Sequence, residues 1–180
     1  DSQSSSIWPL AFPQTTFANA CRFDDGSSDN LSRSNPTPIG SRKIFTISCW
    51  IKRANLGSDQ DFFSNYYSTD NMIEIRFSSD DTLRVHNRGG ASSSVDLRTS
   101  RVFRDTSAWY HLVVAFDTTQ GTSSDRVKIY VNGVQETNFG TSTYPSSDQD
   151  LMNEVASSYT TYIGKRGDSA AFLDVYLAEY

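Results

Sequence analysis

The chain has 180 residues and a formal net charge of −5, with 37% hydrophobic and 13% aromatic residues. A chain of this length can fold as one all-β domain, and its aromatic content is sufficient for a core. The scattered Lys and Arg residues argue against a nucleic-acid partner, which requires clustered positive charge. No apolar run approaches the roughly 18–20 residues that a membrane-spanning helix needs, so we expect no membrane insertion.

Residues 1–16 are interpreted as an N-terminal arm or linker that precedes a β-sandwich domain spanning residues 17–180. The first residues are polar, and the apolar segment 7–13 that follows is interrupted by prolines, which do not suit a central strand. The sequence begins with neither an initiator Met nor a signal-like apolar region. We therefore expect a processed product or a piece of a longer chain, whose arm packs against the domain or a neighbouring subunit.

The rest of the sequence alternates short apolar segments with turn signals and shows no sustained helical period, apart from one helical turn expected over 151–156. The predicted strands cover residues 20–23, 44–51, 62–67, 72–77, 82–86, 94–97, 109–117, 127–131, 159–163 and 172–179. Short strands separated by turns every 8–12 residues or so are typical of an all-β sandwich or barrel.

The strongest local signal is the hairpin expected within residues 109–136. Residues 109–117 are apolar on both faces, which suits a strand in the middle of a sandwich. Residues 127–131 alternate apolar and polar positions, as in a half-buried strand. Asn132-Gly133 follows, and this pair favours a type I′ turn because both residues tolerate positive φ. The sequence therefore predicts an antiparallel meander.

The cysteines and histidines give no sign of a reactive or metal-binding site. Cys21 and Cys49 lie in strand-like segments at positions shared with apolar neighbours, so we expect two buried thiols, although a single disulfide remains open. Their spacing relative to His86 and His111 does not fit a zinc site. No orienting partner can be named for either histidine, and His111 is expected to form a structural hydrogen bond across a sheet.

Short motifs spread over nearly the whole chain carry a family resemblance. They lie at residues 22–23, 31–33, 45–53, 101–105, 107–117, 127–133, 141–145, 162–164 and 176–179. On these motifs the chain resembles the laminin-G-like branch of the concanavalin A-like lectin/glucanase superfamily, above all the copies in structural proteins of marine bacteriophages. The resemblance implies an all-β, antiparallel two-sheet jelly-roll sandwich. It does not specify a ligand.

Because the superfamily includes glycoside hydrolases, catalytic carboxylates must be considered. A retaining glycosidase needs two carboxyl groups about 5–5.5 Å apart. The glucanase branch supplies them from a Glu-x-Asp-x-x-Glu motif, and none of the four glutamates, Glu74, Glu136, Glu154 and Glu179, lies in that spacing. A Gly-x-Ser-x-Gly elbow is also absent from the sequence. We therefore expect no enzymatic activity.

Calcium is the cofactor that the resemblance suggests. In laminin-G-like relatives with a structural Ca²⁺ ion, the ion joins the exit of the first strand to the last strand. The matching residues here are Asp24 or Asp25 and Glu179, which offer the carboxylate oxygens that Ca²⁺ prefers. The alternative is a solvated acidic turn, with Glu179 bonded to a backbone group or an arginine.

Sugar binding requires exposed aromatic rings beside amide or carboxylate groups, which we expect on the loops. The candidate carbohydrate-binding residues are Asn65, Tyr66, Tyr67, Asn87, Arg88 and Tyr144.

The resemblance thus implies a non-catalytic structural or decoration module of a phage-type virion, displaying a carbohydrate-binding surface for adhesion. Its expected partners are other structural subunits, further copies of the chain and a cell-surface glycan. The alternative is a secreted or cell-surface, calcium-dependent lectin-type adhesin.

Overall fold

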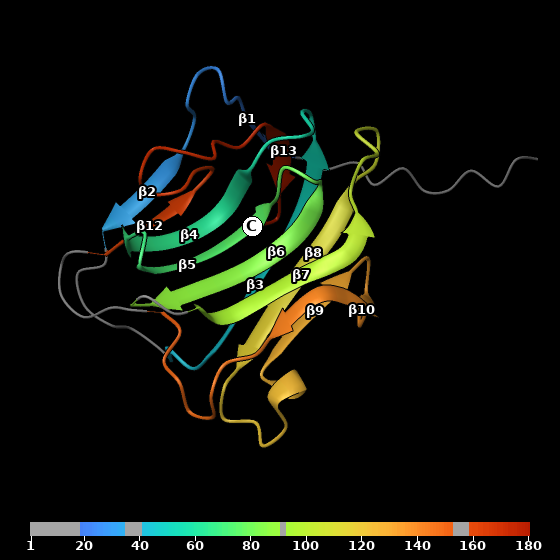
Figure 1. Cartoon of the computed structure of the whole chain (residues 1–180). Helices are drawn as coiled ribbons and strands as arrows, with labels where there is room; N and C mark the ends of the chain where they lie inside the picture. Colours follow the sequence, from blue (N-terminus) through green and yellow to red (C-terminus); the bar gives the residue numbers. More distant parts are fainter. Residues whose placement is uncertain (1–18, 35–40, 91–92, 153–158) are drawn as a thin grey trace, which may run out of the picture.

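The computed structural model describes residues 19–34, 41–90, 93–152 and 159–180, and these form two antiparallel sheets packed face to face (Figure 1). The six-stranded sheet has the order β1 (Cys21–Phe23), β13 (Val175–Ala178), β3 (Ile44–Arg53), β8 (Tyr110–Asp117), β9 (Val127–Val131) and β10 (Val134–Glu136). The seven-stranded sheet has the order β11 (Phe139–Thr143), β7 (Ser93–Val102), β6 (Thr82–Gly89), β5 (Asn71–Phe77), β4 (Gln60–Ser68), β12 (Thr160–Ile163) and β2 (Leu31–Ser34). A short 3-10 helix spans Ser123–Asp125.

The core lies between the two sheets and follows from the alternation of apolar residues along the strands. The six-stranded sheet contributes side chains such as Leu112, Val114 and Ile129, and the seven-stranded sheet contributes Ile75 and Leu97, all at most 1% exposed. Because side chains alternate between the two faces of a strand, the residues between these apolar positions point away from the core. The predicted all-β, two-sheet jelly-roll class is confirmed.

The hairpin that the sequence marks most strongly is present. β8 lies between β3 and β9 inside the six-stranded sheet, and β9 turns directly into β10. Asn132 and Gly133 have φ values of 52° and 78°, as the predicted type I′ turn requires. The Asn132 side chain also accepts a hydrogen bond from the backbone N–H of His111 at 2.8 Å, which fixes the turn to β8.

The sequence did not reveal two edge strands of the seven-stranded sheet. The side chains of β2 are exposed throughout, and those of β11 are exposed apart from a half-buried Phe139, so neither strand shows an apolar alternation. The final strand, β13, begins at Val175 rather than at residue 172 as predicted. The predicted arm at 1–16 and most of the expected helical turn at 151–156 lie outside the described residues.

The cysteines are both free thiols, but only one is buried. Cys49 lies in the core, and burial raises the pKa of its thiol to about 12. The expectation that Cys21 is also buried is wrong, because β1 lies at the edge of its sheet and leaves this side chain exposed. The structural interpretation of His111 is confirmed: its Nε2 lies 3.2 Å from Ser48 Oγ on the neighbouring strand, and its ring stacks on Trp50.

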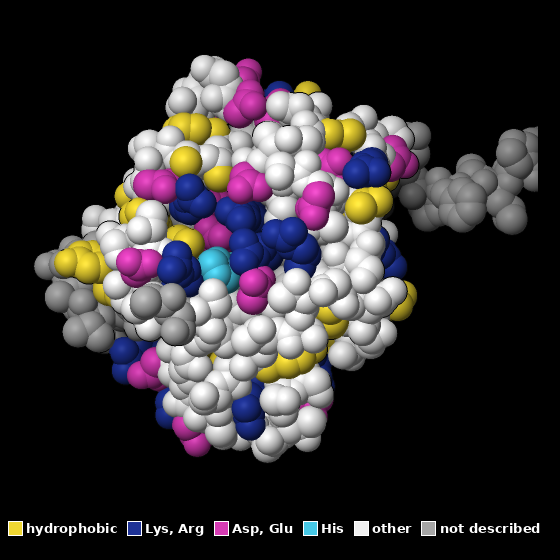
Figure 2. All heavy atoms as spheres, in the orientation of Figure 1, with side chains coloured by type: hydrophobic (Ala, Val, Ile, Leu, Met, Phe, Trp, Pro, Cys, Tyr) yellow, Lys and Arg dark blue, Asp and Glu magenta, His cyan; other side chains and the backbone are white. Residues whose placement is uncertain are grey.

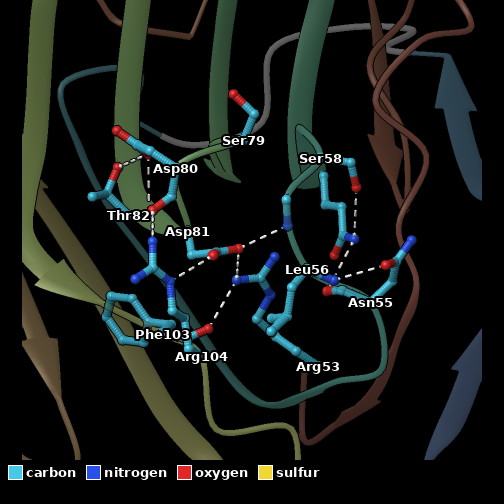
Figure 3. Close-up of polar contacts among 12 residues, drawn as sticks. Arg53, Asn55, Leu56, Ser58, Ser79, Asp80, Asp81, Thr82, Phe103 and Arg104 are labelled. Atoms are coloured by element: carbon cyan, nitrogen blue, oxygen red, sulfur yellow. Dashed lines mark hydrogen bonds and ion pairs between the residues drawn. The ribbon is translucent and has the colours of Figure 1, made fainter.

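A charged network links the end of β3 to the turn between β5 and β6, and thus joins the two sheets (Figure 3). Arg53, whose side chain is fully buried, donates from Nη1 to Asp81 Oδ1 at 3.0 Å and to the Phe103 carbonyl at 2.8 Å. The Asp81 carboxylate also accepts the Gly57 N–H at 2.9 Å and Arg104 Nε at 2.9 Å. Its pKa is lowered, because these donors outweigh the opposing effect of burial.

Among the described residues, no helix has the length and apolar character required to cross a bilayer.

Candidate functional site

The outer face of the seven-stranded sheet carries three rows of side chains, all polar or aromatic apart from Met72, that cross β4, β5, β6 and β7. We call this surface the polar face. Read from β4 to β7, the rows are Tyr66–Met72–Arg88–Ser93, Ser64–Glu74–His86–Asp96 and Asp61–Arg76–Arg84–Arg98. The rows exist because the intervening residues of the same strands, such as Ile73, Ile75 and Val85, point into the core.

Ion pairs hold most of the charged groups on the polar face in place. Arg84 forms a bidentate pair with Asp96, with N–O distances of 2.7 and 2.8 Å. Arg76 Nη1 lies 3.2 Å from Asp59 and 3.3 Å from Glu74. Figure 2, in the same orientation as Figure 1, shows basic side chains gathered over the middle of this face with acidic side chains around them. The charged side chains of this face therefore pair largely with one another.

The pKa values of two buried carboxyl groups on the polar face, Asp61 and Glu74, shift in opposite directions. Burial and the negative charge of Glu74 raise the pKa of Asp61 well above its usual value. Burial opposes ionisation of Glu74 too, but the hydrogen bond from His86 and the charge of Arg76 outweigh it and lower its pKa. Neither carboxylate oxygen of Asp61 has a hydrogen-bond partner among the described residues. The pair therefore combines an ionised Glu74 with an Asp61 that favours the neutral form.

The segment between β12 and β13, residues 164–174, packs against β4 and covers one side of the polar face. Ser64 Oγ donates to the Lys165 carbonyl at 2.9 Å, and the Asp61 N–H donates to the Ala171 carbonyl at 2.9 Å. Gly167 is pressed against the ring of Tyr66, so that a Cβ at this position would lie 2.2 Å from Tyr66 Cδ1. This close packing explains why the side chain of Asp61 is buried although it stands on the outer face of the sheet.

His86 has two side-chain partners, so the expectation that it has none is wrong. Its Nδ1 lies 3.3 Å from Glu74 Oε1 on β5, and its Nε2 lies 2.9 Å from Ser93 Oγ on β7. The three residues come from three adjacent strands. Sequence spacing could not show this arrangement, because it depends on strand order.

The structure brings two of the sugar-binding candidates, Tyr66 and Arg88, into one row at one end of the polar face. Arg88 pairs with Asp70 at 2.9 Å, and the Asp70 carbonyl accepts the Gly90 N–H at 2.7 Å. These contacts join the β4–β5 tip to the β6–β7 turn. Tyr67, which is 54% exposed, lies near the same tip and packs on Tyr159.

The other three candidates lie elsewhere. Asn65 is buried and donates to Thr161 Oγ1 at 3.1 Å, and Asn87 is buried and donates to the carbonyls of Met72 and Leu151. The expectation that these two amides stand on exposed tips is therefore wrong. Tyr144 is half-buried beside a cavity of about 200 Å³ between the 3-10 helix and β10.

The candidate calcium ligands do not line one common cavity. Asp24 accepts the Gly26 N–H within an acidic turn at 2.9 Å, and Asp25 lines a cavity of about 390 Å³ together with Asp59. Glu179 lines a different, more apolar cavity of about 460 Å³ beside Cys21 and Leu177. Within the described part of the chain, no three His, Cys, Asp or Glu side chains lie together as a metal site. The calcium site remains a prediction.

Comparison with protein families identifies the fold family. The model of the Concanavalin A-like lectin/glucanases superfamily matches residues 25–180. The chain belongs to this superfamily. No curated protein sequence matches it. The two-sheet sandwich and its antiparallel strand order are thus those of a concanavalin A-like domain.

Solved structures share the concanavalin A-like fold at low sequence identity. Domains LG4-5 of the mouse laminin alpha1 chain match with a TM-score of 0.61 and 13% identity, covering 90% of this chain and 41% of that chain. A putative carbohydrate binding protein from Bacteroides ovatus matches with a TM-score of 0.54 and 17% identity, covering 89% of this chain and 41% of that chain. Domain 4 of AbnA, solved with arabinotriose, matches with a TM-score of 0.55 and 18% identity, covering 79% of this chain and 62% of that chain. AbnA is a GH43 extracellular arabinanase from Geobacillus stearothermophilus. The chain thus spans about two fifths to three fifths of these chains.

Proposed function

We propose that this domain is a carbohydrate-binding module and that its glycan lies across the polar face. The observation that carries the proposal is the set of three cross-strand rows, which places arginine, carboxylate, hydroxyl and aromatic groups side by side on one surface. Sugars are recognised by such combinations of planar hydrogen-bonding groups and aromatic rings. Structural neighbours that include a putative carbohydrate binding protein and an arabinanase domain solved with arabinotriose support this assignment of class.

We further propose that the module acts as an adhesion surface on a phage-type particle, next to other structural subunits. This step rests on the phage-like sequence motifs and not on the comparisons. It implies an extracellular location on the virion. In the alternative, a secreted or cell-surface adhesin, the same face would bind glycan with the help of calcium held by Asp24, Asp25 and Glu179.

A glycan array with the full chain, followed by calorimetry on the best glycan, tests the proposal. Arg98→Ala removes a guanidinium at the exposed end of the third row, and we expect it to weaken binding about tenfold. Arg22→Ala is the matched control: both arginines are ion-paired and their side chains are 36% exposed, but Arg22 stands on the other sheet. Equal losses from both variants, or the absence of glycan binding by a folded sample, would contradict the proposed face.

Repeating the titration with EDTA separates the two versions of the function. Unchanged affinity would assign recognition to the polar face alone. Loss of binding that is restored by added Ca²⁺, and mimicked by Glu179→Gln, would support the calcium-dependent adhesin.

A further inference from the structure

The polar face contains a hydrogen-bonded chain of a serine, a histidine and a carboxylate. Ser93 Oγ lies 2.9 Å from His86 Nε2, and His86 Nδ1 lies 3.3 Å from Glu74 Oε1. A nucleophile within hydrogen-bonding reach of a base, with that base oriented by a third group, is the arrangement that activates serine for attack on an acyl group. Glycan binding does not require a chain in this order.

A β-bulge turns Ser93 toward the histidine. The register between β6 and β7 shifts between the pairs Asn87–Val95 and Arg88–Ser93, so that Ser94 is the extra residue. Ser94 Oγ consequently donates to the buried Asn87, whereas Ser93 lies on the polar face and is exposed. Bulges are frequent next to active sites because they redirect a side chain in this way. Ser93 is therefore accessible to a substrate from solution.

The charge of Glu74 determines which nitrogen of His86 carries the proton. Glu74 is buried and ionised, since His86 and Arg76 stabilise its negative charge. An ionised carboxylate can only accept a hydrogen bond, so Nδ1 must be protonated in the neutral ring. Nε2 is then left as the acceptor for the Ser93 hydroxyl, which is the tautomer required of a general base.

A cation that is ion-paired with Asp70 at 2.9 Å lies beside the serine. Arg88 is the cross-strand partner of Ser93 in the register, which places their Cβ atoms about 5 Å apart. Its side chain stands on the same face, where a positive charge would stabilise an oxyanion formed on the acyl group.

We propose that Ser93 and His86 hydrolyse small acyl esters, with Glu74 as the positioning residue. Ser93 Oγ bonds to the acyl carbon while its proton passes to His86 Nε2, and His86 returns that proton to the departing alkoxide as the ester C–O bond breaks. Water then attacks the acyl-serine, loses a proton to His86 and releases the carboxylic acid, and Ser93 recovers its proton. The substrate class, acetyl esters of carbohydrates, rests on the proposed function. The assignment of Ser93 as the nucleophile rests on its contact with His86 alone.

The test measures hydrolysis of p-nitrophenyl acetate by the full chain, together with labelling by a fluorophosphonate probe mapped by peptide mass spectrometry. We expect the probe on Ser93, and a loss of at least about a hundredfold in kcat/KM for Ser93→Ala and for His86→Asn. Ser100→Ala is the matched control and should leave turnover unchanged, because this exposed serine of the same strand bonds to Asn138 and does not contact His86. Glu74→Gln should lower kcat with KM unchanged, since Glu74 acts through the imidazole and not on the substrate.

Ser93 is exposed, so its alanine variant should fold normally, and an unchanged thermal transition verifies this. No turnover above buffer, labelling elsewhere, or turnover that survives Ser93→Ala would each overturn the proposal. Hydrolysis of the aryl ester without hydrolysis of glucose pentaacetate would overturn the carbohydrate class alone. Glycan binding retained by Ser93→Ala would show that recognition and hydrolysis are separate properties of the face.

Discussion

Two charged clusters, the network around Asp81 and the group around Asp61 on the polar face, differ in how completely their carboxylates are paired. In the network that joins the sheets, the Asp81 carboxylate accepts hydrogen bonds from Arg53, Arg104 and the Gly57 N–H (Figure 3). On the polar face, both carboxylate oxygens of Asp61 lack a partner among the described residues. The first cluster is arranged to hold the sandwich together, whereas the second holds a carboxyl group that opposes folding when it is ionised.

The pKa values of the two aspartates express this difference. Both are buried, which disfavours the charged form in each case. The partners of Asp81 reverse that effect and lower its pKa, whereas the negative charge of Glu74 adds to the effect of burial at Asp61. Removing Arg53 from the first cluster should therefore destabilise the protein, whereas neutralising Asp61 in the second should stabilise it.

The largest effect is expected for Arg53→Met, which breaks the network between the sheets. Methionine retains much of the packing on Phe77, over whose ring the guanidinium carbon lies 4.5 Å from the centroid. The Asp81 carboxylate would lose a buried counter-ion, and removing one member of such a pair costs about 3–5 kcal/mol. Urea unfolding at neutral pH measures the loss. A change below about 1 kcal/mol would show that Arg53 acts only as a packed side chain.

A smaller loss is expected for Gly167→Ala, which tests how tightly the segment 164–174 covers the polar face. The new methyl group would overlap the ring of Tyr66, and overpacking of this kind typically costs about 1–3 kcal/mol. Gly121→Ala is the matched control, because a Cβ added at that residue would have no neighbour within 4 Å. Thermal unfolding of both variants measures the difference. Equal transition temperatures for the two variants would mean that the segment 164–174 moves enough to accommodate the added methyl group.

The core strands and the residues of the polar face differ in how far the sequence predicts them. The alternation in β3, β5 and β8 and the Asn132-Gly133 turn allowed the core strands and the sandwich to be predicted, since these signals are local. The edge strands β2 and β11 were missed because polar, exposed strands have no alternation. The chain from Glu74 through His86 to Ser93 depends on strand order and on a bulge, and the burial of Asp61 depends on a segment about a hundred residues away.

A moderate effect of the opposite sign is expected for Asp61→Asn. The pKa of Asp61 is raised on folding, so the wild-type protein loses stability as pH rises from the unfolded pKa through the folded pKa. Asparagine does not titrate, so the free energy of unfolding of the variant should exceed that of the wild type by about 1.4 kcal/mol for each pKa unit of that shift. Urea unfolding at pH 4 and pH 8 should show a gain mainly at the higher pH.

Glu74→Gln provides the opposite case, because the pKa of Glu74 is lowered on folding. Its stabilising contribution is present above the unfolded pKa and is lost as pH falls through the folded pKa, so the variant should be the less stable protein at pH 8. If both variants shifted stability in the same direction at pH 8, the opposed ionisation of the two carboxyl groups would be refuted.

The smallest effect is expected for Arg104→Ala, although Arg104 binds the same carboxylate as Arg53. Its side chain is 61% exposed, so water replaces the lost ion pair, and exposed pairs contribute at most about 1 kcal/mol. The change should shrink further in high salt, because exposed charges are screened. Urea midpoints at low and high salt measure both effects. A loss as large as that of Arg53→Met would locate the strength of the network in the number of bonds to Asp81 rather than in the burial of one arginine.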